Sequence, residues 1–79
     1  MSADQEGAAL ALTAGQLDLI RAADRGALTF IGGWFLLDGY DPAVVTPEAR
    51  ELVFAGMLVK DGSAVKATAA GRAVLAVAS

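Results

Sequence analysis

The fold is decided by residues 46–75, which read TPEARELVFAGMLVKDGSAVKATAAGRAVL. Thr46, Pro47 and Glu48 form a typical helix start. Threonine can cap the helix, proline fits a first turn that needs no backbone donor, and glutamate suits the positive end of the helix dipole. This pattern predicts the main helix over 47–55. Its apolar residues recur at helical spacing, so one side of this helix should be buried.

Two short runs of strand-forming residues, 57–60 and 64–67, follow the main helix. An Asp-Gly pair at 61–62 lies between them and is a turn signal that favours a two-stranded hairpin. Thr68 can cap the next helix, which we expect over 69–78. The second half of the chain is therefore predicted to run helix, hairpin, helix.

A further helix is predicted upstream of this region. Thr13 and Gln16 have the spacing of a capping box, in which each side chain bonds the backbone N–H of the other residue. We expect the helix over 14–25, and Gly26 fits a left-handed cap at its C-terminal end.

The stretch 27–37 admits two interpretations. It is rich in β-formers on both sides of Gly32-Gly33, and such a pair suits a tight hairpin because both central positions need positive φ. One buried helix is the alternative, although two adjacent glycines would cost it about 2 kcal/mol. We favour the hairpin. A short helix over 42–45, capped by Asp41, should then precede the main helix.

Composition limits the kinds of site that the chain can hold. Its 79 residues suit a single α+β domain, expected over 12–79 after a flexible arm at 1–11. The chain has no cysteine and no histidine, so disulfides, thiolate zinc sites and Ser-His or Cys-His nucleophile pairs cannot form. Glu48 and Glu51 lie three apart on one helix, but such acids are far more often solvated than catalytic. We expect no enzyme, no metal ion and no cofactor.

No membrane span is predicted. The longest uncharged run, 26–37, falls well short of the roughly 20 residues that a span needs. Asp4 and Glu6 stand where a signal peptide would carry lysine or arginine. We therefore expect a cytoplasmic protein.

The stretch 46–75 resembles the ends of many small bacterial winged-helix regulators. In those, a pattern such as L…GLL…V.LT..GR.LL runs from the recognition helix through the wing into the closing helix. The resemblance implies a winged-helix fold: a first helix, a β-hairpin or buried helix, a short helix, the main helix, a two-stranded wing and a closing helix. We expect Leu58 and Val65 to pair across the wing. The residues that carry the resemblance are Leu52, Gly56, Met57, Leu58, Val65, Thr68, Gly71, Arg72 and Leu75.

The usual role of that family is transcriptional regulation by a dimer that reads DNA with the main helix. Phosphate contacts normally need a basic face, yet the net charge of this chain is −3. Glu48 and Glu51 on the main helix would also oppose phosphates. The basic residues that could form one strip are Arg50, Lys60, Lys66 and Arg72.

The excess of apolar residues suggests a different role. In a hairpin, Trp34 and Leu36 would point to one face and Phe35 and Leu37 to the other, and so small a domain can hardly cover both. We favour a non-enzymatic regulatory module that binds a protein partner, or a second copy of itself, through apolar surfaces. A small inhibitor or adaptor of a mobile element or phage would fit. The expected anchor residues are Trp34, Phe35, Tyr40 and Phe54.

Overall fold

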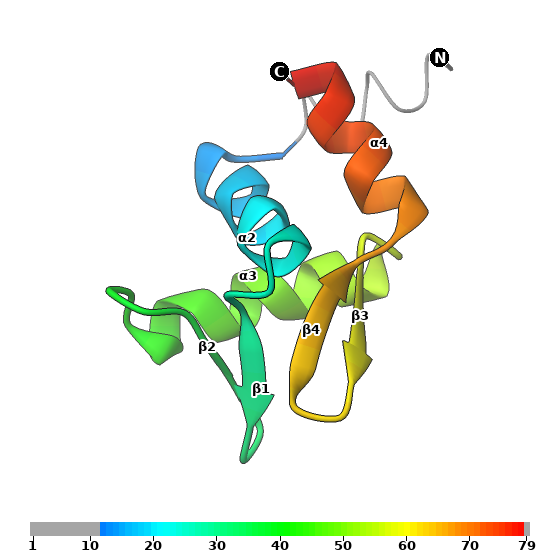
Figure 1. Cartoon of the computed structure of the whole chain (residues 1–79). Coiled ribbons are helices and arrows are strands. Elements are labelled where there is room, and N and C mark those ends of the chain that lie inside the picture. The colour runs from blue at the N-terminus through cyan, green and yellow to red at the C-terminus, as the bar shows by residue number, and fades with distance from the viewer. Residues whose placement is uncertain (1–11, 79) are drawn as a thin grey trace.

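The computed structural model describes residues 12–78, which form an α+β domain of three helices and one four-stranded antiparallel sheet (Figure 1). The strands lie in the order β2-β1-β4-β3, so both β2 and β3 are edge strands. The arm expected over 1–11 lies outside the described residues. The elements are α2 (Ala14–Asp24), β1 (Thr29–Ile31), β2 (Trp34–Leu36), α3 (Pro42–Phe54), β3 (Leu58–Asp61), β4 (Ala64–Ala67) and α4 (Ala69–Ala78).

Helix α2 begins with the predicted capping box. The Thr13 hydroxyl accepts a hydrogen bond from the Gln16 N–H at 3.0 Å, and the Gln16 side chain accepts one from the Thr13 N–H at 3.2 Å. Gly26, with φ of +79°, follows the helix in the left-handed conformation that was expected there. The Gln16 amide also donates to Glu51 Oε2 of α3 at 3.1 Å. Gln16, the third residue of α2, therefore both caps this helix and ties it to α3.

The stretch between α2 and α3 is a hairpin, so the buried-helix alternative is wrong. Gly32 and Gly33 have φ of +60° and +85°, as a two-residue type I′ loop requires. The loop sets the register, in which Ile31 pairs with Trp34 and Phe30 with Phe35. Residues with a Cβ rarely adopt these φ angles, so the glycine pair decides the conformation.

Helix α3 is continuous, so the prediction of a short helix over 42–45 followed by a main helix over 47–55 is wrong. Asp41 caps the whole helix by accepting the Ala43 N–H at 3.0 Å. Pro47 lies inside the helix, where its missing N–H removes a single intrahelical hydrogen bond. Thr46 is not a cap: its buried hydroxyl accepts the Phe35 N–H at 3.0 Å and links α3 to the edge of β2.

The second hairpin, β3-β4, has a different register from the one expected. Leu58 pairs with Ala67 and Val65 with Lys60, so the predicted Leu58–Val65 pair is wrong. Asp61 pairs with Ala64, which makes residues 62–63 the loop rather than 61–62. The shift by one residue puts glycine at the first loop position with φ of +63°, the position that a type II′ turn reserves for it.

Helix α4 packs on α2 and closes the core, and the loops of both hairpins lie at the end of the domain away from it (Figure 1). Its bounds match the predicted 69–78, and Thr68 caps it as expected by accepting the Gly71 N–H at 3.1 Å. The core is built mainly of aliphatic side chains from all three helices and the sheet. Its largest fully buried members are Ile20, Leu28, Leu52, Val45, Val65 and Val74.

Candidate functional site

The sheet has one face covered by helices and one open face. Successive side chains alternate between the two faces of a strand, so the register assigns each residue to one of them. Phe35 and Val65 lie on the covered face and are buried. The open face is called the outer face below, and it consists of Thr29, Ile31, Trp34, Leu36, Val59, Asp61, Ala64 and Lys66.

The outer face is apolar over β1 and β2. Trp34 is 50% exposed, and its cross-strand partner Ile31 is exposed to a similar extent. Leu36 is half-buried on the same face. The solvated face of an antiparallel sheet usually carries polar side chains. Three large apolar residues side by side in this position therefore make the outer face unusual for a free surface.

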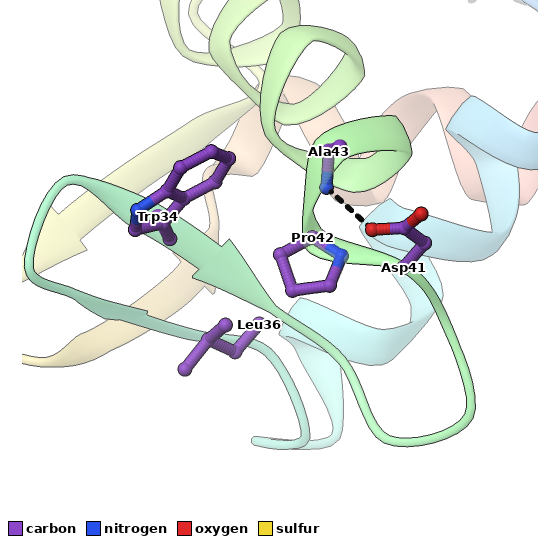
Figure 2. A pocket seen from close by; sticks show the side chains of 5 residues that line it. All are labelled: Trp34, Leu36, Asp41, Pro42 and Ala43. Atoms are coloured by element: carbon purple, nitrogen blue, oxygen red, sulfur yellow. Dashed lines mark hydrogen bonds between the residues drawn. The ribbon is translucent and has the colours of Figure 1, made fainter.

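A shallow hollow of about 350 Å³ continues the outer face past the edge of β2. Trp34 and Leu36 form one side of it, and Pro42 and Ala43 at the start of α3 form the other (Figure 2). The hydrogen bond from the Ala43 N–H to the Asp41 carboxylate fixes this first turn of α3. The hollow thus lies between the apolar residues at the fixed start of α3 and the half-exposed indole of Trp34.

A second cavity, of about 330 Å³, lies between α3 and the covered face of the sheet and is called the basic cavity below. The Lys60 ammonium lies 4.5 Å from the ring centroid of Phe30, as in a cation–π contact. Arg50 contributes a second cation, and among residues 12–78 neither cation forms an ion pair. The lining residues are Phe30, Gly33, Phe35, Arg50, Val53, Phe54 and Lys60.

The four basic residues considered for DNA contact do not form one strip. Arg50 and Lys60 line the basic cavity, whereas Lys66 and Arg72 line a different cavity. The register of β3 and β4 places Lys60 and Lys66 on opposite faces of the sheet. Lys66 also pairs with Asp61 at 3.3 Å, which offsets its charge. Of the four cations, Arg50 and Lys60 therefore lie together at one cavity, and neither forms an ion pair within residues 12–78.

A third cavity lies between α2 and α3 and is called the acidic cavity below. Asp18 and Glu48 stand at its rim, one from each helix. Val44 is 62% exposed beside it, and Tyr40 is exposed to more than half. The lining residues are Gly15, Asp18, Leu19, Leu37, Tyr40, Val44, Val45 and Glu48.

The aromatic residues expected to anchor a partner fall into different surroundings. Trp34 belongs to the outer face, Tyr40 to the acidic cavity and Phe54, which is 86% exposed, to the basic cavity. Phe35 is only 2% exposed, because its strand position turns it under α3 into the core. Phe35 therefore cannot serve as an exposed anchor.

Sequence reasoning missed Ile31 and Val44 as surface residues. Ile31 could have been found, because a two-residue loop at Gly32-Gly33 must pair it with Trp34 on the same face. The exposure of Val44 could not have been predicted, because it depends on how far α3 extends and on which side of α3 faces α2.

Residues 12–78 hold no group of three or more acidic side chains that could bind a metal ion. Over that same part of the chain, no helix combines the length and the apolar character needed to cross a bilayer. Comparison with models of known families, with curated proteins and with solved structures finds no match.

Proposed function

We propose that this protein is a non-enzymatic binding module that engages a protein partner through the outer face of its sheet. The observation that carries this proposal is the row of large apolar side chains, Ile31, Trp34 and Leu36, on a sheet face that no helix covers. Contiguous exposed apolar surface of this kind marks interaction sites in small soluble domains.

Trp34 is the natural centre of the binding surface. Tryptophan is enriched among the residues that dominate interface energies, and its ring loses little conformational entropy on binding. Half of this side chain is still exposed, so covering the remainder contributes about 2 kcal/mol. The adjacent hollow between β2 and the start of α3 offers space for one apolar side chain of the partner.

We further propose that the scaffold is a variant of the winged-helix arrangement. The order of a first helix, a β-hairpin, a main helix, a two-stranded wing and a closing helix supports this relationship. A helix-turn-helix unit, however, joins two helices by a short turn. Here the β1-β2 hairpin stands between α2 and α3. The variant thus keeps the wing and the closing helix while replacing one helix of the DNA-reading unit.

DNA binding is the alternative function, and Arg50 with Lys60 is the observation that favours it. Two neighbouring cations without ion pairs could contact phosphates near α3. The case is weakened because Lys66 and Arg72 lie elsewhere and Lys66 is already paired. Two cations supply little of the non-specific affinity that such proteins need.

The protein-binding proposal is tested by comparing variants as baits in cells of the source organism. The wild type, the outer-face variant Ile31→Ser with Trp34→Ser, and the matched variant Phe54→Ser are each purified with their bound proteins, which are quantified by mass spectrometry. Circular dichroism confirms that all three are folded. We expect the same partner with the wild type and Phe54→Ser, and its loss with the outer-face variant. Equal recovery by all three would refute the proposal.

A salt titration with random duplex DNA tests the alternative. Binding to phosphates weakens linearly on a logarithmic scale as salt rises, with a slope that tracks the number of contacts. We expect no binding even at low salt. Measurable binding that is lost in the variant Arg50→Gln with Lys60→Gln would favour DNA as the partner.

A further inference from the structure

Helix α3 carries two cavities of opposite charge on its two flanks. Arg50 lines the basic cavity and Glu48 lines the acidic cavity. These residues are two apart in the sequence, and each residue of an α-helix advances about 100° around the axis. Their side chains therefore leave the helix about 200° apart. The single helix α3 thus separates a positive surface from a negative one.

The basic flank combines charge with protruding apolar surface. Phe54 is 86% exposed at the end of α3, which makes it the most exposed large apolar residue among those described. Arg50 and Lys60 stand beside it, and neither meets an acidic side chain in residues 12–78. An aromatic ring flanked by two unpaired cations suits a partner surface that is apolar in the middle and acidic at its rim.

The acidic flank of α3 is apolar in the middle and acidic at its rim. Its floor is apolar, formed by Leu19, Leu37 and Val45, and Val44 stands exposed beside it. Glu48 at the rim has no ion pair in the described part of the chain, while Asp18 shares its charge with Arg21 at 3.0 Å. Glu48 is therefore the carboxylate with charge available for a partner cation.

We propose that a second copy of this chain docks head to tail, with the basic flank of α3 in one copy against the acidic flank of the next. Phe54 of one copy would cover the apolar floor beside Val44, and Arg50 would approach Glu48. The occupant is inferred to be a second copy because both halves of a complementary pair are present on one small domain. This contact is separate from the outer face and does not depend on it.

The two flanks differ, so the contact is heterologous rather than two-fold symmetric. Each copy that joins leaves one basic flank and one acidic flank free, and the assembly grows until it closes into a ring or extends as a filament. Ion pairs at the rim of such a contact are screened by salt. Self-association should therefore increase with protein concentration and decrease with ionic strength.

The test uses two variants that each disable one flank with neutral side chains. Arg50→Gln with Phe54→Ser removes the basic flank, and Val44→Ser with Glu48→Gln removes the acidic flank. All four positions are exposed or half-buried, so both variants should fold, as circular dichroism can confirm. Molar mass is measured by light scattering over a concentration series, at low salt and at about 1 M salt, where the Debye length is about 3 Å.

We expect the molar mass of the wild type to exceed the 8.0 kDa of one chain. The excess should rise with protein concentration and fall at high salt. Each variant alone should remain a monomer. An equal mixture of the two should form a complex of twice that mass and nothing larger, because only one complementary contact is left. A wild type that stays monomeric at every concentration, or a mixture that stays monomeric, would overturn the proposal.

A third variant separates this contact from the outer face. Trp34→Ser alters the outer face and leaves both flanks of α3 unchanged, so we expect its self-association to equal that of the wild type. If association instead persists in both flank variants and is lost in Trp34→Ser, the copies meet through the outer face. That outcome would overturn the head-to-tail contact while supporting the proposed use of the outer face.

Discussion

Gly71 of α4 lies so close to the carbonyl oxygen of Met57 that a Cβ atom at this position would overlap it. The same carbonyl accepts a hydrogen bond from the Thr68 N–H at 3.0 Å. The two contacts hold the first turn of α4 against the chain that enters β3. A residue without a side chain is therefore needed at the point where the closing helix meets the second hairpin.

Gly71→Ala should lower the free energy of unfolding by about 1–3 kcal/mol, because the backbone of Met57 cannot move aside cheaply. The loss is expected even though alanine is the better helix former. Gly15→Ala in α2 is the matched control, since a Cβ there meets only the Thr13 hydroxyl at 3.8 Å. That variant should gain about 0.5 kcal/mol. Urea titrations of both variants measure the difference, and equal stabilities would contradict the packing described.

Thr68→Ala should destabilise the protein more than Thr13→Ala does. Both residues cap a helix, and losing a cap costs about 1 kcal/mol. The Thr68 hydroxyl additionally donates to the Gly56 carbonyl and so joins α4 to the end of α3. Thr68→Ser keeps the hydroxyl and should retain most of the stability. Thermal unfolding followed by circular dichroism ranks the three variants, and a Thr13→Ala variant that melts first would count against this role.

Thr46→Val should cost about 1–3 kcal/mol, because the buried Phe35 N–H then loses its acceptor. Valine has nearly the same shape as threonine, so the loss reports the hydrogen bond rather than a cavity. Thr46→Ser restores an acceptor and should recover part of the loss. Amide hydrogen exchange provides a local measurement, in which the Phe35 amide should exchange faster in the valine variant.

Two of the three phenylalanines that line the basic cavity, Phe35 and Phe54, should differ sharply in their contribution to stability. Phe35→Ala removes a core ring and should cost about 3–5 kcal/mol of unfolding free energy. Phe54→Ala removes an exposed ring and should change stability by less than about 0.5 kcal/mol. Denaturant titration of the two variants compares them directly. A large loss from Phe54→Ala would mean that its ring packs on the domain.

Short-range features were predictable from the sequence. The capping box of Thr13 and Gln16, the loop at Gly32-Gly33 and the bounds of α4 all depend on residues a few positions apart. Side-chain alternation also predicts that Trp34 and Leu36 share a face. These features follow from local backbone chemistry, which is why they agree with the structure.

Features that depend on contacts between distant residues were not predictable. Thr46 has the sequence pattern of a helix cap, but its hydroxyl is used by the Phe35 N–H eleven residues earlier. The pairing of Leu58 with Ala67 rather than with Val65 depends on a loop position that differs by one residue from the expected one. Arg50 and Lys60 line the same cavity because α3 packs on the sheet, and that packing could not be predicted from the sequence.

The hydrogen bond between Thr46 and Phe35 also limits how the sheet can be extended. Ile31 and Trp34 close a two-residue loop, so Phe35 is the one residue of β2 whose amide points away from β1, and Thr46 already occupies that amide. In the sheet formed by residues 12–78, only the β3 edge is therefore left for a strand of another copy to join. Two copies paired through β3 would leave no open edge in this sheet. Growth by strand addition would therefore stop at two copies and would not produce a cross-β fibre.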